Sequence, residues 1–540
     1  MMTARDTSVG TRRFIQISVR ASHPAVKRLP APITRPGRLE NRDTIEYGAG
    51  MQRRLPVIAA TCLLCAGAAQ SSEIRLHEDR LSLKANHESL RDVLAEFVRA
   101  GVDVKLEPGI DAVVDGTLDD EPIDEGLDAL LDSFNYVLYW DVLQGPVGPL
   151  TRLAGMHVFR PGQRHAVVPF HPQGNTLVPA HLPGAPLHAK DELLLGLKPG
   201  TTAKQFRELL AWIDATAVGS ISSFGIYQVR LPRDSNVPAI VATLKNNPWV
   251  AAAEPNYIHQ IAAPVSDTSD GGTRSASTAA DPPPGAAAMA IFDSGLMDLD
   301  LLGDSVVGTY DAVDPSQKIT DALGHGTQMA LIASGAVVPR GLSEVTGENG
   351  VPIIAIKAFD DEGQSSNYSL LRGMNFAIAE GGRVISMSWG TDVESAFLEH
   401  AVQYAQENDM VVVAAAGNEP NGQPVYPAAY HGVIAVSAMT ADGRIWDRSN
   451  YGSFVSAAGP GSATFPVGHN GPPGAYVGTS IATPVVASAL TQYFANHPDA
   501  TAVEATAALN DALTDLGDPG RDDYYGHGAL DAEALKRLLE

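Results

Sequence analysis

Cysteine is almost absent from this chain, which has only two among its 540 residues. Cys62 and Cys65 both lie inside one apolar run, residues 55–69, where their C-x-x-C spacing is a weak signal for redox or metal chemistry. Beyond residue 70 the chain has no cysteine at all. Disulfide bonds and thiol chemistry are therefore excluded from that part of the protein.

Basic side chains are also scarce, with 38 Lys and Arg against 62 Asp and Glu and a formal net charge of -24. This acidic balance argues against nucleic acid as the main partner. Three common motifs of zinc and nucleotide sites are missing as well, namely HExxH, GxxxxGK(S/T) and GxGxxG. The apolar fraction of 44% is that of a globular protein, and the length predicts several domains.

The apolar run of residues 55–69 is too short to predict a membrane span with confidence. It follows Met51-Gln52-Arg53-Arg54 and ends in small residues, which is the layout of a secretory signal peptide. We expect residues 51–70 to be that signal and the protein to be exported, to the periplasm or beyond the cell. Translation would then start at Met51, and residues 1–50 would not be translated. The alternative is a genuine basic and disordered extension.

Residues 74–160 alternate short strands and helices, which predicts a small α+β domain. The helices are expected over residues 89–100 and 123–133, with Ser89 and Asp92 as a capping pair. The sequence LSLKANHESLRDVLAEF and the residues after it resemble the secretin and TonB short N-terminal domain. That resemblance implies a docking module with a partner in the cell envelope. An accessory domain without a partner is the alternative.

A proline-rich linker, residues 161–189, precedes a second α+β pattern over residues 190–258. Its strands are expected at 192–197, 226–231 and 250–253, and its helices at 202–215 and 237–246. ELLLGLKPGTT and NNPWVAAAEPNY in this region resemble the propeptide of subtilisin-like proteases. The resemblance implies an intramolecular chaperone and inhibitor whose C-terminal tail lies in the active site. Residues 259–286, rich in Ala, Ser, Thr, Asp and Pro, would be the cleavable linker.

From residue 287 to 540 short continuous apolar runs alternate with helical segments. The runs are residues 288–292, 351–357, 383–387, 410–415 and 432–437, with helices expected at 368–380 and 394–408. This alternation predicts a parallel sheet covered by helices on both faces. In such a sheet, functional groups collect at the C-terminal ends of the strands.

Three polar residues stand at such positions. Asp293 ends the first strand, His325 opens a helix in GHGTQMA, and Ser480 opens another in GTSIATP. A serine at a helix start is by itself most often a cap. Together the three can supply a nucleophile, a base and a carboxylate that fixes the imidazole tautomer. The helix N-terminus beside His325 is expected to keep its imidazole neutral.

Asn418 follows a buried strand in AAAGN, and its amide could donate to an oxyanion together with the backbone N–H of Ser480. Singly, each of these residues has a structural explanation, for example a turn at Asn418. In the order Asp, His, Asn, Ser the catalytic interpretation is favoured.

Residues 287–540 resemble the subtilisin-like serine proteases in AIFDSG, GHGTQMA, SMSWG, AAAGN and GTSIATPVVAS. The resemblance implies a subtilisin-like α/β fold and a secreted, self-processing endopeptidase acting on proteins or peptides, with its own propeptide as inhibitor. It also implies that Ser388, Trp389 and Gly390 bind the substrate backbone; a strand end with one packed Trp is the alternative. Gln328, Met329, Val485 and Ser488 depart from the family's common residues and bear on pocket shape and helix packing.

No cofactor is expected to be required. Structural Ca²⁺ could be held by the Asp-rich residues 298–304 or 518–523, as in many relatives, but these pieces lack a defined ligand spacing, which favours solvated acidic loops. A rival function is an envelope-tethered binding protein whose protease-like domain stays shut by its propeptide.

Overall fold

The computed structural model describes residues 15–18, 73–77, 80–108, 110, 112–131, 134–145, 148–161, 163–170, 178–180, 186–262, 265–267, 276–315, 317–342, 350–470 and 472–540. The expected signal peptide, residues 51–70, lies outside these ranges, as does nearly all of residues 1–50. Among the described helices, none has both the length and the apolarity needed to cross a membrane. The chain forms two compact units, one of residues 14–140 and 153–172, the other including residues 141–152 and 173–540.

The described residues of the smaller unit form two sheets and two helices. One sheet has the order β2–β3–β5 and the other β1–β6–β7–β4–β8. Helices α1 (Leu90–Arg99) and α2 (Ile123–Leu130) contribute to its core, and Ser89 caps α1 by accepting from the Asp92 backbone N–H, as predicted. Its strands and one 3-10 helix are β1 (Ile15–Ser18), β2 (Glu73–His77), β3 (Arg80–Ser89), β4 (Asp103–Leu106), β5 (Val113–Pro122), β6 (Asn135–Gly145), β7 (Gly148–Phe159), η1 (Arg164–Ala166) and β8 (Val168–Pro169).

An antiparallel sheet of order β11–β12–β10–β13 and two helices follow. The strands are β9 (Pro179–Ala180), β10 (His188–Leu197), β11 (Thr216–Ile221), β12 (Ile226–Arg230) and β13 (Val250–Gln260), and the helices are α3 (Ala203–Trp212) and α4 (Val237–Leu244). Thr202 and Gln205 form a capping box at α3, and Asn236 caps α4. We call this part, residues 188–260, the prodomain sheet unit.

Two strands of this unit differ from the sequence-based expectation. Residues 216–221 form β11, which was not predicted, and β13 runs on to Gln260 instead of ending at residue 253. The last three residues of the extension, 258–260, pair antiparallel with β18 (Gln364–Ser366) of the following domain. Part of the expected linker 259–286 is therefore strand, because a neighbouring strand supplies its hydrogen bonds.

The rest of the chain is built on the predicted parallel sheet. Its seven strands have the order β16–β17–β15–β19–β20–β21–β22, and every pairing is parallel. They are β15 (Met289–Asp293), β16 (Val306–Asp311), β17 (Ile353–Lys357), β19 (Val384–Met387), β20 (Val411–Ala415), β21 (Ile434–Met439) and β22 (Val455–Pro460). A smaller sheet of β14 (Val265–Ser266), β24 (Gly474–Val477) and β23 (Ser462–Phe465) lies beside it in the same domain.

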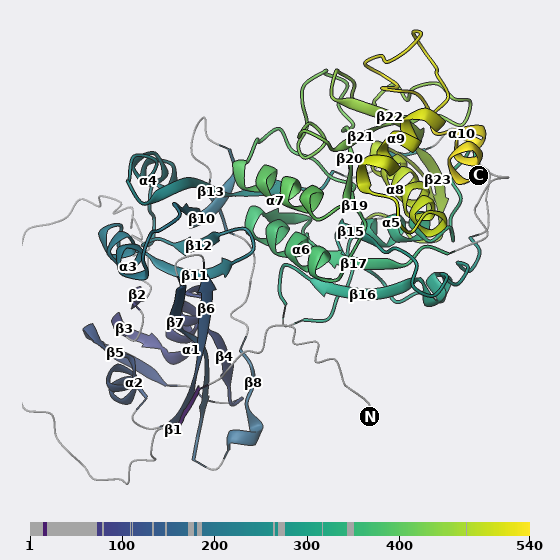
Figure 1. Cartoon of the computed structure of the whole chain (residues 1–540). Coiled ribbons are helices and arrows are strands. Elements are labelled where there is room, and N and C mark those ends of the chain that lie inside the picture. The colour runs from purple at the N-terminus through teal and green to yellow at the C-terminus, as the bar shows by residue number, and fades with distance from the viewer. Residues whose placement is uncertain are drawn as a thin grey trace, which may run out of the picture. The chain divides into compact units, whose positions relative to one another are not determined.

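Helices cover both faces of this sheet (Figure 1). Met289 and Ile291 of β15 pack in the core that includes α5 (His325–Ala333) and α8 (Thr479–Asn496). Ala290 and Phe292 pack in the opposite core, with α6 (Asn367–Ala379) and α7 (Ala396–Glu407). This alternation is the two-residue period of a strand that is buried on both faces. The remaining elements are η2 (Asp300–Ser305), α9 (Ala502–Ala512) and α10 (Ala532–Leu539).

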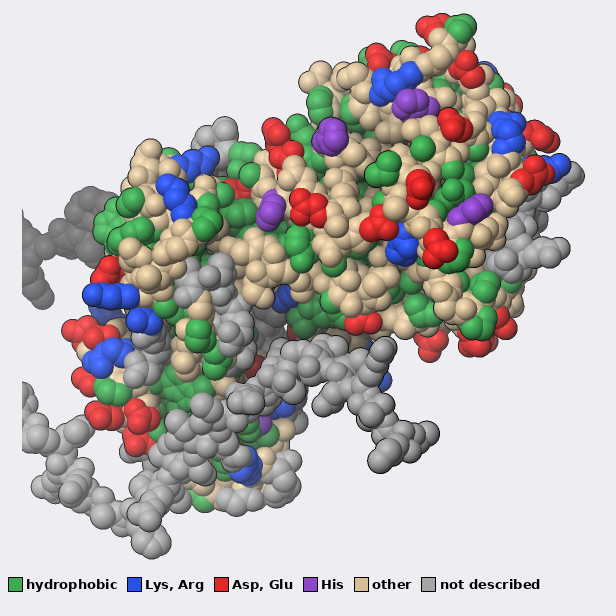
Figure 2. All heavy atoms as spheres, in the orientation of Figure 1, with side chains coloured by type: hydrophobic (Ala, Val, Ile, Leu, Met, Phe, Trp, Pro, Cys, Tyr) green, Lys and Arg blue, Asp and Glu red, His purple; other side chains and the backbone are tan. Residues whose placement is uncertain are grey.

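The acidic side chains of this domain do not gather into one patch on the face drawn in Figure 2. On the face drawn in Figure 2, Asp and Glu side chains are scattered over the part that holds β15 to β22, with Lys and Arg among them. The excess negative charge is thus spread over this face.

Candidate active site

Asp293 and His325 meet at the C-terminal edge of the parallel sheet. Asp293 is the last residue of β15, and its Oδ1 lies 2.6 Å from His325 Nδ1. The same oxygen accepts the Ser294 backbone N–H at 2.8 Å. Both side chains are almost completely buried. The carboxylate therefore holds the ring with Nδ1 protonated and Nε2 available as an acceptor.

Asp321 fixes the start of α5, although it was not among the predicted site residues. Its Oδ1 accepts from the Gly324 N–H and the Ser294 hydroxyl, each at 2.8 Å. Its Oδ2 accepts from the Thr327 N–H and hydroxyl, at 2.8 and 2.6 Å. One buried carboxylate thus ties the first turn of α5 to the loop after β15. This joins the two segments that carry His325 and Asp293.

Ser480 lies at the start of α8, and α8 packs beside α5 in the same core. Ser488 Oγ donates to Ala333 O at 3.1 Å. Ser488 lies eight residues after Ser480, and Ala333 lies eight residues after His325. Both helices begin at the C-terminal edge of the sheet, so they run in the same direction. In this register the first turns of α5 and α8, which carry His325 and Ser480, lie at the same end of the helix pair. Neither Ser480 Oγ nor His325 Nε2 has a hydrogen-bond partner among the described residues, and both atoms are buried.

Asn418 and Ser388 both bond to the start of α8. Asn418 Oδ1 accepts the Thr479 N–H at 3.0 Å and the Thr479 hydroxyl at 2.8 Å. Because that oxygen is held by two donors, the amide nitrogen must point elsewhere. Asn418 Nδ2 and Ser480 Oγ lie 3.4 and 3.2 Å from one point, the position that a Cβ of Gly478 would take. Ser388 Oγ donates to Ser480 O at 2.9 Å.

The Trp389 side chain is buried between its own domain and the prodomain strand β13. Its ring lies 5.6 Å from that of Phe359 and is stacked on that of His259, at 5.9 Å. His259 belongs to the prodomain strand β13, so part of this burial depends on the docked prodomain sheet unit. The assignment of Ser388, Trp389 and Gly390 to substrate binding stays a prediction.

A loop between β23 and β24 covers His325. The ring of His469 meets that of His325 edge-on, with centroids 5.2 Å apart. Buried Gln328 donates from Nε2 to Val467 O at 2.9 Å, and the Asn470 N–H donates to Leu323 O. Gln328, which departs from the family's common residue, thus holds this loop over the histidine. His469 was not predicted, because its proximity to His325 depends on the tertiary fold.

The pKa of His325 differs in direction from the sequence-based expectation. Burial lowers it, but the charge of Asp293, the hydrogen bond that Asp293 accepts from the ring and the charge of Asp321 outweigh burial and raise the pKa above its ordinary value. The two carboxylates therefore act against the helix N-terminus, which favours the neutral ring. His469 behaves oppositely, since burial and the neighbouring His325 lower its pKa to about 4.

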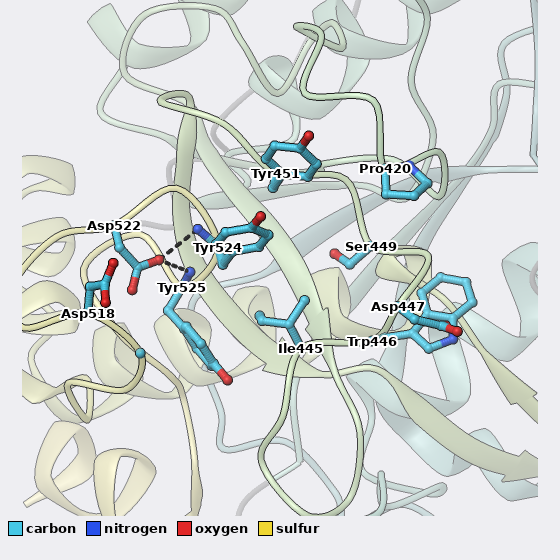
Figure 3. Close-up of a pocket in the computed structure, with 11 residues that line it drawn as sticks. Pro420, Ile445, Trp446, Asp447, Ser449, Tyr451, Asp518, Asp522, Tyr524 and Tyr525 are labelled. Carbon is cyan, nitrogen blue, oxygen red and sulfur yellow. Dashed lines mark hydrogen bonds between the residues drawn. The ribbon is translucent and has the colours of Figure 1, made fainter.

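A separate hollow of about 580 Å³ lies near the C-terminal loop, and none of the predicted catalytic or substrate-binding residues lines it (Figure 3). Its walls include Trp446, Tyr451 and Tyr524, together with Asp518 and Asp522 from the Asp-rich residues 518–523. Asp522 Oδ1 accepts from the backbone N–H groups of Tyr524 and Tyr525, so it stabilises a turn. Within the described part of the chain, no three His, Cys, Asp or Glu side chains gather as metal ligands would. Calcium binding stays a prediction.

Comparisons with known proteins agree with this arrangement. The model of the subtilase family matches residues 285–528, and that of the fervidolysin N-terminal prodomain matches residues 176–256. The minor extracellular protease Epr of Bacillus subtilis is 35% identical over 247 residues, covering 46% of this chain and 38% of that protein. The thermophilic serine proteinase of Bacillus sp. strain AK1 is 33% identical over 302 residues, covering 52% and 72%. Thermitase of Thermoactinomyces vulgaris is 37% identical over 204 residues, covering 37% and 72%.

Among solved structures, fervidolysin of Fervidobacterium pennivorans, a keratinolytic enzyme related to subtilisin, superposes with a TM-score of 0.53 at 20% identity. The match covers 67% of this chain and 62% of that one, and it shows a shared fold. The expected likeness of residues 74–160 to the secretin and TonB domain stays a prediction. The chain belongs to the subtilisin family of serine proteases and carries a fervidolysin-type prodomain before its catalytic domain.

Proposed function

We propose that this protein is an exported, self-processing serine endopeptidase in which Ser480 is the nucleophile. The observation that carries the proposal is the pairing of Asp293 with His325 Nδ1 while His325 Nε2 and Ser480 Oγ, in register on α5 and α8, bond to no other described group. A buried hydroxyl and a buried ring nitrogen without partners are costly, and a bound peptide would use both.

In this reaction Ser480 Oγ attacks the carbonyl carbon of the substrate while His325 Nε2 accepts the hydroxyl proton. Asp293 keeps the ring in the required tautomer and stabilises the imidazolium that forms. The amide of Asn418 and the backbone N–H of Ser480 at the α8 N-terminus donate to the oxyanion. His325 then returns the proton to the leaving amine, and water hydrolyses the acyl-enzyme in a second cycle.

The prodomain sheet unit would inhibit the enzyme before activation. Its last strand, β13, extends the edge strand β18, and Ile258 pairs with Ser366. Glu254 accepts from the Asn367 side chain at 3.0 Å, from Ser395 Oγ and from the Ala396 N–H at 3.2 Å, at the N-termini of α6 and α7. The positive ends of two helices thus hold one prodomain carboxylate.

The path of the chain after β13 indicates where self-cleavage would occur. The Ile261 N–H donates to Gly363 O, which continues the β13–β18 pairing. Four residues later Val265 pairs with Val477, three residues before Ser480. The scissile bond would therefore lie between residues 261 and 265, inside the expected linker 259–286.

The test is the full chain with Ser480→Ala. We expect the variant to remain a single uncut polypeptide, since no nucleophile remains. The measurement is intact mass spectrometry of the exported protein, which also reports whether residues 51–70 are removed. Thr491→Ser is the matched control on the same helix, and it should be cut as the unchanged chain is. A Ser480→Ala chain cut between residues 261 and 265 in a protease-free host would contradict the proposal.

The N-terminal unit and the destination of the protein are part of the same proposal. The signal-like residues 51–70 support export to the periplasm or beyond, and the pattern of residues 74–160 supports docking to an envelope partner. Calcium, if bound, would be structural. Proteins or peptides would be the substrates, and nucleic acid is not expected as a partner.

A further inference from the structure

Two glycine-containing segments face each other across a narrow slot next to Ser480. One segment is residues 388–390, tied to α8 by the bond from Ser388 Oγ to Ser480 O. The other is residues 416–418, tied to α8 by the bonds from Thr479 to Asn418 Oδ1. Each segment carries a glycine, Gly390 or Gly417. Since glycine has no side chain, two such walls leave room between them.

One side chain, that of Val425, fills this room. Its Cγ1 lies 2.3 Å from the position that a Cβ of Gly390 would take, and its Cγ2 lies 3.3 Å from the corresponding point of Gly417. The two methyl groups therefore lie against opposite walls. A Cβ on Gly390 could not be accommodated without moving Val425.

The backbone around Val425 is held in place on both sides. The Tyr426 N–H and O pair with Thr391 O and N–H, each at 2.8 Å. The Ala429 N–H donates to Val425 O at 2.8 Å, and Asn450 Nδ2 donates to Gln423 O at 3.0 Å. These bonds fix the backbone on both sides of the valine.

We propose that Val425 restricts the residue on the acyl side of the cleaved bond to a small side chain, alanine or glycine above all. This inference rests on the proposed function. The attacked carbonyl must reach both Ser480 Oγ and the Asn418 amide, which stand where the two walls meet α8. The side chain of the same residue then points into the slot, where the Val425 methyl groups take the space that a large side chain would need.

The chain's own sequence is consistent with this preference. Between Ile261 and Val265, where self-cleavage is proposed, the residues are Ala262, Ala263 and Pro264. In sequence, this segment holds only small side chains and one proline.

The test compares peptide anilides that differ only in the residue whose carbonyl is attacked, from Gly and Ala to Leu and Phe. The unchanged, self-processed protein should cleave the Ala peptide at least about tenfold more efficiently, in kcat/KM, than the Phe peptide, because a pocket discriminates by about 10-fold or more per methylene. Val425→Gly and Val425→Ala should raise kcat/KM for Leu and Phe and reverse the order. Val503→Ala, an exposed valine on α9, is the matched control and should leave the profile unchanged.

Labelling by a fluorophosphonate reports the active sites independently of the peptide series. Equal cleavage of Phe and Ala peptides by the unchanged protein would overturn the proposal, whatever the variants do. So would a Val425→Gly chain that labels fully and keeps the original profile. Absence of labelling in every chain would instead contradict the proposed protease function itself.

Discussion

At the scale of single residues, Asn418 is oriented by the bonds that it accepts. Thr479 occupies its Oδ1 through both N–H and hydroxyl, so the amide N–H groups are directed to the space that Ser480 Oγ borders. A donor placed in advance costs no reorganisation when charge develops on the substrate oxygen. Thr479 therefore acts as a positioning residue for the proposed oxyanion donor.

We predict that Asn418→Ala lowers kcat by about 100- to 1000-fold and leaves KM nearly unchanged, a magnitude taken from the loss of the corresponding donor in subtilisin. The reason is that the lost hydrogen bond exists only in the transition state. Steady-state kinetics with one peptide substrate would measure it. A rise in KM with kcat unchanged would show that Asn418 binds the ground state instead.

The positions of the four main residues could be predicted from sequence because each follows a buried apolar strand or opens a helix. Asp293, His325, Asn418 and Ser480 stand at such boundaries, and the parallel sheet brings the boundaries to one edge. Asp321 and His469 could not be found in this way. Their roles depend on side chains that reach His325 or its helix from loops, and no local periodicity records such contacts.

At the scale of elements, β13 joins the prodomain sheet unit to the catalytic domain. Asn367, at the start of α6, contacts two residues of β13. The Nδ2 of Asn367 donates to Glu254, and its Oδ1 lies 2.5 Å from His259 Nε2. Burial raises the pKa of Glu254 to about 7 against the hydrogen bonds it accepts. Burial lowers the pKa of His259, whose Nδ1 has no partner among the described residues.

These two pKa shifts predict an optimum in the docking of β13. The pKa of docked Glu254, about 7, is higher than the free value of 4.5. The contribution of Glu254 to the stability of docking is therefore present in acid and is lost as the pH rises through about 7. Docked His259 resists protonation. Its contribution to the stability of docking is therefore present above pH 6.5 and is lost as the pH falls below that value. Docking should therefore be strongest in mildly acidic solution.

Hydrogen exchange of the Ile261 amide in the uncut Ser480→Ala chain, corrected for intrinsic rates, would measure this docking. We expect slower exchange at mildly acidic pH than at pH 8, by about tenfold or more. Glu254→Gln should remove the faster exchange at alkaline pH, and His259→Gln should remove the faster exchange at acidic pH. Corrected rates that do not change with pH in the Ser480→Ala chain would contradict the assignment of these two groups.

Part of β13 could not be predicted from the sequence pattern. Residues 254–260 have no strand-like alternation of their own. They are extended because β10 pairs with residues 254, 255 and 257 and β18 pairs with residues 258–260. Residues 216–221, with Gly219 in the middle, were missed for a similar reason, since β12 pairs with them. Gly219 also has no room for a side chain, because a Cβ would lie 2.4 Å from the Tyr368 hydroxyl.

At the scale of the whole molecule, the chain combines a subtilisin-family catalytic domain, a fervidolysin-type prodomain and a further N-terminal unit. The class of sheet could be predicted from alternating runs and helices. Its strand order could not, because β15 lies between β17 and β19 through crossovers that no spacing specifies. The proposed function requires that one latent serine become reactive once the prodomain has been cut.

The central claim is that Ser480 is that serine, and covalent labelling tests it most directly. The self-processed protein should take up one fluorophosphonate per chain, and peptide mapping should place it on Ser480. The Asp293→Asn chain should be labelled more slowly. A protein that cleaves peptides while the label maps to another residue, or while Ser480 stays unmodified, would contradict the account.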